Sequence, residues 1–270
     1  MSKQQKNSVG GLSPAATGIV FVLALVAGVL LYMFVFGSPD NFEGGNPDNH
    51  PKKGNFLGVI YKGGVIVPVL LACVILVFTF FIERLITLSR AAGSGDIAGF
   101  VRKIRLSLSN GNVDEAITAC DKQKGSVANV VSAGLHKYKE MQGASGLDKD
   151  TKVMAIQKEI EEAQSLEMPM LERNLIVFST LAPVATLIAL LGTVIGMIKA
   201  FSALANAGAP DSVGLANGIS EALINTALGI GTSAVAIIFY NFFTTKIDGM
   251  VHGIEEAGYS ISQTFASQQK

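Results

Sequence analysis

Four long apolar runs constrain the fold of this 270-residue chain more than any other feature. They cover residues 16–36, 64–86, 175–203 and 213–243, and a helix of about 20 residues crosses the roughly 30 Å of hydrocarbon in a bilayer. A mean hydropathy of +0.44 and 16% charged residues also favour a membrane as the solvent. The sequence therefore predicts an all-α integral membrane protein with four transmembrane helices. The first run is longer than a signal-peptide core and lacks a clear cleavage site, so we expect it to be retained.

Charge and cysteine content argue against several classes of function. The 21 lysines and arginines are balanced by 21 aspartates and glutamates, which leaves no net charge to attract nucleic acid. Cys73 and Cys120 show no disulfide framework or metal-ligand spacing. The three histidines are scattered and accompany no nucleophile or phosphate loop. We expect no enzyme activity, no cofactor, no metal and no nucleic-acid partner.

The distribution of basic residues predicts the orientation in the membrane. The segment between the second and third runs carries twelve lysines and arginines, whereas residues 206–212 carry none. Because basic loops stay in the cytoplasm, this segment and both termini should be cytoplasmic. Lys52, Lys53 and Lys62 would then lie outside, accompanied by acidic residues. The expected location is the bacterial inner (cytoplasmic) membrane, crossed several times.

The chain then divides into seven segments. We expect a cytoplasmic N-terminus (1–15), an extra transmembrane helix (16–36), a periplasmic connector (37–63) and a second span (64–86). A cytoplasmic helical domain (87–174), a channel-forming hairpin (175–243) and a cytoplasmic tail (244–270) follow. The connector should contain a short helix at 56–61. Breaks at 109–111 and 124–125 separate amphipathic cytoplasmic helices. A longer helix beginning near Lys152 should continue into the third span, kinked at Pro169 and Pro183. The last two spans thus extend as long helices into the cytoplasm.

Small and polar residues distinguish the third and fourth spans from the first two. They form stripes at helical spacing: Ser179, Thr186 and Thr193 on the third span; Glu221, Asn225 and Thr232 on one face of the fourth, with Thr226 and Ser233 beside it. Such stripes suit helices around a polar pore. They also suit helix packing, as do the pairs Gly192 with Gly196 and Gly214 with Gly218, and both interpretations stay open.

Counting from a hairpin turn near Pro210 predicts which residues share a depth in the membrane. Thr193 and Thr226 should lie at one level, and Lys199 should lie opposite Glu221. A lone charge there is costly, so we expect an ion pair or access to water. The pair either holds the hairpin together or lies on a proton path. The apolar runs contain no aspartate, so a central carboxylate for proton transfer would come from a partner protein.

The chain resembles the MotA/TolQ/ExbB proton-channel family. The resemblance rests on Leu-Glu-Arg-Asn-Leu at 171–175, Leu-Leu-Gly-Thr-Val-Ile-Gly-Met at 190–197 with Ala-Phe at 200–201, and Ile-Ser-Glu-Ala-Leu-Ile-Asn-Thr-Ala-Leu-Gly at 219–229 followed by Tyr-Asn at 240–241. These motifs cover about a third of the chain and are most similar to ExbB and TolQ. Three departures stand out: Ala185-Thr186 and Ala189 replace an Ala-Pro pair and a glycine, Lys199 replaces an often neutral residue, and the first span is additional.

The resemblance implies a ring of identical subunits, a pentamer in this family, around the single-span helix of an ExbD-like partner that supplies an aspartate. Thr193 and Thr226 then match threonines that line the pore, and the glutamate that matches Glu221 is a family feature. Proton flow would drive movement that reaches a TonB-like protein and energises outer-membrane transport. Membrane lipid is a further partner.

Two alternatives to an ExbB-like motor subunit remain open. One is a TolQ-like or MotA-like stator subunit, although the short segment after the fourth span argues against MotA. The other is a passive membrane assembly scaffold. The expected proton-pathway residues are Thr193, Thr226, Glu221, Asn225 and Thr186, while Ser179, Gly192, Gly196, Gly229, Thr232 and Ser233 would line the pore or pack the helices.

Overall fold

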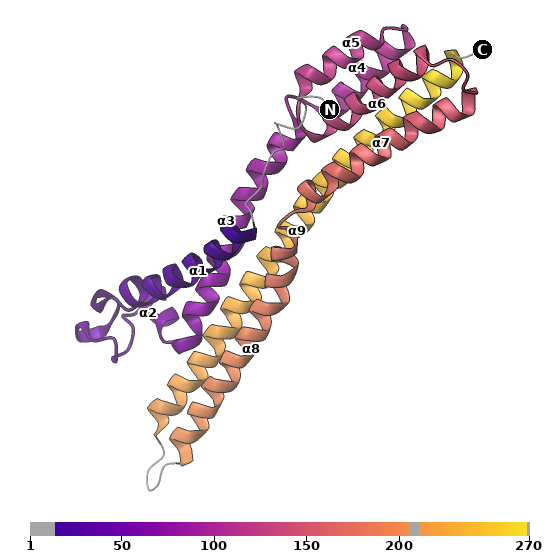
Figure 1. The fold of residues 1–270 in the computed structure, drawn as a ribbon. Helices are drawn as coiled ribbons and strands as arrows, with labels where there is room; N and C mark the ends of the chain where they lie inside the picture. The colour runs from indigo at the N-terminus through magenta and orange to yellow at the C-terminus, as the bar shows by residue number, and fades with distance from the viewer. Residues whose placement is uncertain (1–13, 206–210, 269–270) are drawn as a thin grey trace. The chain divides into compact units, whose positions relative to one another are not determined.

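A computed structural model describes residues 14–205 and 211–268, and nearly all of them are helical. In chain order the elements are α1 (Pro14–Leu30), the π-helical turn η2 (Leu31–Phe36), the 3-10 turns η3 (Pro39–Asn41) and η4 (Glu43–Gly45), α2 (Phe56–Tyr61), η5 (Gly64–Ile66), α3 (Val67–Ala92), α4 (Ile97–Ser109), α5 (Val113–Gln123), α6 (Gly125–Gly143), α7 (Lys149–Glu172), α8 (Leu175–Ala205) and α9 (Ser212–Gln268) (Figure 1). Within the described residues the β pairing is limited to one isolated bridge, between Phe42 and Pro51.

Four helical stretches are long and apolar enough to cross a membrane. They are Ala15–Phe36, in α1 and η2; Gly64–Ser109, which contains α3 and α4; Lys149–Ala205, which contains α7 and α8; and Ser212–Gln268, which is α9. The predicted all-α fold with four transmembrane helices is confirmed, and the chain is a multi-pass membrane protein. The expected turn near Pro210 and most of the N-terminal segment lie outside the described residues.

The chain forms two compact units, and each is described by itself. The first, here called the membrane unit, comprises residues 12–82 and 174–241. The second, here called the polar unit, contains residues 83–173 and 242–268. Both α3 and α9 begin in the membrane unit and end in the polar unit.

In the membrane unit, α1 packs closely on α3 through small residues. A Cβ added at Gly28 would lie 2.5 Å from the Pro68 carbonyl oxygen and 3.0 Å from the Ala72 nitrogen. The end of this span is held by Tyr32, whose ring stacks on Tyr61 at 4.6 Å between centroids and whose hydroxyl donates to the Tyr61 carbonyl. The additional first span therefore has specific contacts with the rest of the membrane unit.

The connector at 37–63 is an ordered cap around Asn41. The Asn41 amide donates to the Val35 and Phe36 carbonyls at 2.7 and 2.9 Å, which satisfies groups at the end of η2. Lys62 Nζ donates to the Pro47 and Asp48 carbonyls at 2.8 and 3.0 Å. Burial lowers the pKa of Lys62, and the Asp48 carboxylate opposes that shift. The short helix expected at 56–61 is α2.

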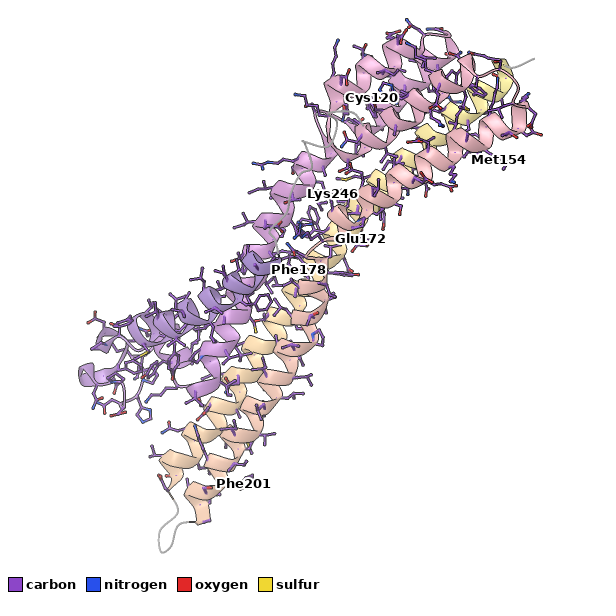
Figure 2. The ribbon with its side chains drawn as sticks, viewed as in Figure 1. Cys120, Met154, Glu172, Phe178, Phe201 and Lys246 are labelled. Carbon is purple, nitrogen blue, oxygen red and sulfur yellow. The ribbon has the colours of Figure 1, made fainter. Side chains whose placement is uncertain are left out.

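The polar unit packs α4, α5, α6 and α7 with the end of α9. The expected breaks near 110 and 124 are present, with positive φ at Gly111, Lys124 and Gly125. Tyr138 of α6 is fully buried, and its hydroxyl lies 2.8 Å from Gln268 Oε1 of α9. Cys120 of α5, labelled in Figure 2, is buried, and this burial, with Asp121 nearby, raises the pKa of its thiol to about 12.

The expected continuous helix from Lys152 into the third span is wrong at one point. Helix α7 ends at Glu172 and α8 begins at Leu175, while Asn174 has a φ of +61°. A left-handed residue ends a helix, and asparagine tolerates that conformation better than most residues. Pro169 and Pro183 both lie inside their helices.

Arg84 of α3 binds the end of α7 within the polar unit. Its side chain is completely buried, donates to the Leu171 carbonyl at 3.3 Å and forms two 2.7 Å hydrogen bonds to Glu83. A cation beside the last carbonyls of a helix complements the helix dipole. The Glu83–Arg84 pair expected from the sequence is therefore present, and Arg84 also anchors α7.

Candidate functional site

Helices α8 and α9 meet along a seam of small side chains. A Cβ added at Gly196 would lie 2.7 Å from the Ala222 nitrogen and 2.8 Å from the Gly218 carbonyl oxygen, and one added at Gly229 would collide with Ala189. Gly192 lies against Asn225 in the same way. Small residues permit such close backbone approach in membrane helices. The structure thus places Gly192, Gly196 and Gly229 in the helix contact.

Thr193 and Thr226 face each other across this seam. Their hydroxyl oxygens are 2.6 Å apart, and either hydroxyl can be the donor. Thr193 Oγ1 also lies 3.0 Å from the Ala189 carbonyl oxygen, and Thr226 Oγ1 lies 3.1 Å from that of Ala222. The two hydroxyls share one level of the hairpin, as the counting argument predicts. The two hydroxyls form a polar contact between two largely apolar helices.

An ion pair lies nearer the C-terminal end of α8 and the N-terminal end of α9. Lys199 Nζ is 2.7 and 2.9 Å from the two carboxylate oxygens of Glu221. The Glu221 side chain is 9% exposed and that of Lys199 is 49% exposed. Burial of a carboxylate is costly unless a partner compensates its charge. Lys199 supplies that charge, and its own exposure leaves one side of the pair open.

Asn225 and Gly64 attach the start of the second span to α9 beside this ion pair. Asn225 is completely buried, and its amide donates to the Gly63 carbonyl at 2.9 Å. Gly64 has a φ of +76° and its α-carbon faces the Glu221 carboxylate, so that an added Cβ would collide with it. Sequence reasoning missed this contact. The Gly63-Gly64 pair at the start of the second apolar run is the available signal, because adjacent glycines permit close approach.

Three of the four remaining predicted hydroxyls bond to the backbone of their own helix. Ser179, Thr186 and Thr232 donate to the carbonyls of Ile176, Ala182 and Leu228. Thr232 is buried, whereas Ser179 is exposed and Ser233 is half-buried. The structure therefore brings together Thr193 with Thr226, and Lys199 with Glu221 beside Asn225. Ser179 and Thr186 have no side-chain partner among the described residues.

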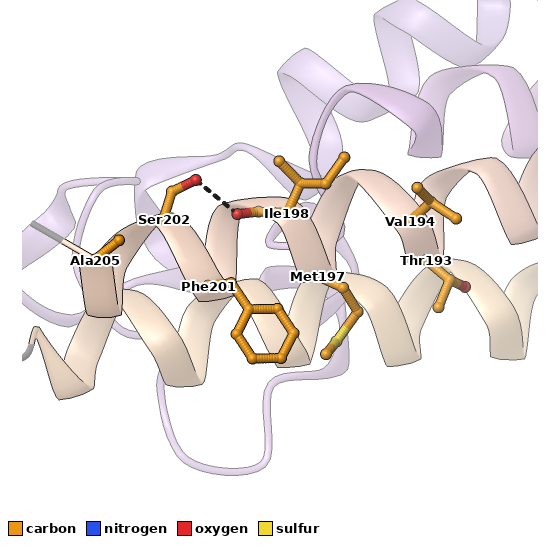
Figure 3. A pocket seen from close by; sticks show the side chains of 7 residues that line it. All are labelled: Thr193, Val194, Met197, Ile198, Phe201, Ser202 and Ala205. Atoms are coloured by element: carbon orange, nitrogen blue, oxygen red, sulfur yellow. Dashed lines mark hydrogen bonds between the residues drawn. The ribbon is translucent and has the colours of Figure 1, made fainter.

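A shallow groove of about 560 Å³ runs along α8 from Thr193. Figure 3 shows its lining on one side of the helix: Thr193, Val194, Met197, Ile198, Phe201, Ser202 and Ala205. Ser202 donates to the Ile198 carbonyl, so the lining is largely apolar. Within the described residues, no three histidine, cysteine or acidic side chains gather as metal ligands. The arrangement offers hydroxyls and one ion pair beside an open apolar surface.

Four apolar spans, with a hydroxyl pair and an ion pair in the hairpin of α8 and α9, define a multi-pass membrane protein. A family model for the MotA/TolQ/ExbB proton channel family matches residues 122–256, which include the whole seam. The chain belongs to this family.

Similar proteins carry ExbB and TolQ names. An ExbB-like biopolymer transport protein of Synechocystis sp. is 36% identical over 86 residues, 31% of this chain and 41% of the relative. The Tol-Pal system protein TolQ of Pseudomonas aeruginosa is 29% identical over 125 residues, 46% of this chain and 54% of the relative. A biopolymer transport ExbB homologue of Methanothermobacter thermautotrophicus is 28% identical over 213 residues, 74% of this chain and 68% of the relative. The chain spans about half the length of the first two relatives.

Proposed function

We propose that this chain is an ExbB-like subunit of an inner-membrane motor that is driven by the proton-motive force. It works with an ExbD-like single-span protein and energises TonB-dependent transport across the outer membrane. Both termini and the polar unit lie in the cytoplasm, and the chain forms a homo-oligomeric ring, a pentamer by resemblance to the family. Family membership and the ExbB names of similar proteins support this proposal.

The Thr193–Thr226 hydroxyl pair is the observation that carries the proposal. A carboxylate that gains and loses a proton inside a bilayer needs neighbours that hydrogen-bond both forms. A hydroxyl can do so, because it both donates and accepts. Thr193 of this pair lies at the start of the groove along α8, which offers an apolar surface to the partner's helix. An aspartate on that helix would reach the two hydroxyls.

Removal of one hydroxyl at a time tests the proposal. Thr193→Val and Thr226→Val keep the side-chain volume but lose the hydroxyl, whereas Thr193→Ser and Thr226→Ser keep it. We expect both valine variants to form the complex with normal yield and to lower proton-driven uptake about tenfold, which corresponds to one lost hydrogen bond of about 1.4 kcal/mol. The serine variants should retain uptake. Unchanged uptake in both valine variants would contradict the motor and favour a passive scaffold.

A TolQ-like or MotA-like stator subunit is the second candidate, favoured by the similarity to TolQ. The partner distinguishes these roles. Purification of the tagged chain from its own cells should recover a short protein with one apolar span and a central aspartate. Its periplasmic portion would then show whether it serves a TonB-type system, a Tol-type system or a flagellar stator.

A further inference from the structure

The exposed side of α4 carries three basic residues within about one turn. Arg102, Lys103 and Arg105 are exposed, and α4 contains no aspartate or glutamate. Among the described residues, none of the ion pairs involves these three cations. Leu106, 58% exposed, lies one turn from Arg102. This basic face therefore surrounds an exposed apolar side chain with positive charge.

Helix α7 has an outward face of the opposite charge. Between residues 159 and 172 the helix carries five glutamates and no lysine or arginine; Glu159 and Glu167 are half-buried, and Glu167 accepts a hydrogen bond from the Asn129 amide. Glu161 and Glu162 are exposed, and Leu166, 78% exposed, lies one turn from Glu162. Lys158 lies 3.6 Å from Glu162, with both side chains in solvent, and such pairs contribute little. Met154, 64% exposed, lies about two turns before Glu162, toward the start of α7 (Figure 2).

The basic and acidic faces lie on different sides of the polar unit. Gly253 of α9 contacts Ile97 of α4, and Gly258 of α9 contacts Ile160 of α7. These glycines are five residues apart, which corresponds to about 140° around a helix axis. In Figure 1, α6 lies between α4 and α7. The basic face and the acidic face of one chain therefore cannot contact each other.

We propose that the basic face of α4 in one copy of this chain binds the acidic face of α7 in a second copy. Leu106 would pack against Leu166, with Arg102 and Arg105 beside the glutamates. An apolar centre with a charged rim is the usual anatomy of a protein interface, and complementary charge fixes its register. A contact between two different surfaces is heterologous, so it repeats from copy to copy and can close a ring.

This inference rests on the proposed function only in that a ring requires contacts between copies. Anionic lipid would also attract the basic face, but it would repel the acidic face of α7. A second copy of the chain satisfies both faces at once, and it is present at equal concentration.

Cross-linking between two tagged copies tests the contact. Cys73 and Cys120 are first replaced by alanine; one copy then carries Leu106→Cys and the other Leu166→Cys. We expect a disulfide-linked dimer in the mixed oligomer and little in oligomers of either variant alone. Arg102→Glu with Arg105→Glu should lower the yield about tenfold, and so should Glu161→Arg with Glu162→Arg, because like charges then meet. Combination of both reversals, one on each tagged copy, should restore the yield.

The outcomes separate this contact from the motor itself. Copies that copurify without the Leu106–Leu166 cross-link, or that cross-link equally through identical positions, would overturn the contact and leave the ring intact. Copies that do not associate would overturn both. The charge reversal on α4 could instead lower the yield of the cross-linked dimer without recovery when the charges on α7 are also reversed. That result, together with weaker binding to vesicles of anionic lipid, would show that the basic face binds the membrane. Circular dichroism and the unfolding midpoint verify that each variant is folded.

Discussion

Gly64 determines where the Glu221 carboxylate can lie. Its φ of +76° favours glycine, and an added Cβ would meet Glu221 Oε1. We expect Gly64→Ala to lower the free energy of unfolding by about 2–3 kcal/mol, since it combines backbone strain with displacement of a buried charge. The measurement is the unfolding midpoint of the purified protein in detergent.

Gly54→Ala is the matched control for Gly64→Ala. Gly54 has a φ of +81° but open space around it, so alanine there should cost only the backbone term of about 1 kcal/mol. Equal losses in the two variants would mean that contact with Glu221 contributes nothing. A larger loss at Gly64, reduced when Lys199→Met is also present, would establish the coupling to the ion pair.

At the level of residues, the sequence predicts contacts that regular helix geometry relates by counting. Thr193 with Thr226 and Lys199 with Glu221 follow from two antiparallel helices around one turn. The hydrogen bond from Asn225 to Gly63 does not, because it joins residues 162 positions apart through an irregular loop. A hydropathy pattern does not predict a hydrogen bond of this kind. The roles of these residues in proton transfer remain predictions.

Among the elements, α1 is held to α3 by close packing at Gly28. We expect Gly28→Val to weaken this contact, because its Cβ would press on the Pro68 carbonyl and the Ala72 backbone. Overpacking of this kind costs about 1–3 kcal/mol. Gly18→Val, also in α1, has no atom within 4 Å of its added Cβ and should be neutral. Thermal unfolding of both variants in detergent measures the difference, and equal midpoints would refute specific α1–α3 packing.

The end of α7 depends on the buried guanidinium of Arg84. We expect Arg84→Met to destabilise the polar unit by about 3 kcal/mol, because it removes the cation that compensates the charge of the Glu83 carboxylate, which is 14% exposed. Arg84→Lys should rescue only part of this loss, since lysine lacks the two-pronged donor geometry. Arg90→Met, on the exposed side of the same helix, is the control. Denaturant unfolding followed by circular dichroism compares them, and a loss as small as the control's would show that Arg84 does not anchor α7.

Helix ends were predictable where glycine or a polar cluster marks them. Gly111 and Gly125 stand at such ends, with φ of +75° and +81°. The end at Asn174 was missed because apolar and polar residues continue on both sides with no glycine or proline beside it. A single asparagine in the left-handed conformation supplies the whole signal there. Hydropathy patterns therefore predict the presence of a helix more reliably than they predict where that helix is interrupted.

For the whole molecule, length and hydropathy were enough to predict four spans, because a bilayer requires every spanning segment to satisfy its own backbone. The same argument says nothing about the first span's contacts, which depend on Gly28 and on Tyr32 stacked on Tyr61. Nor does it distinguish a hairpin that packs from one that conducts. Both use small and hydroxyl residues, and the seam of α8 and α9 shows that packing is at least one of their roles.

Whether the ion pair holds the hairpin together or acts on the proton path can be decided by charge removal in the assembled protein. We expect Glu221→Gln to leave ring assembly near normal, because Lys199 is half-exposed and can be hydrated when unpaired, while proton-driven uptake falls about tenfold. The double variant Lys199→Met with Glu221→Gln removes both charges and should assemble equally well without regaining uptake. If the double variant recovers uptake, the pair is only an internal brace, since a brace can be replaced by neutral packing and a proton-binding carboxylate cannot. Native mass spectrometry measures assembly, and uptake of a substrate whose transport depends on the proton-motive force measures coupling.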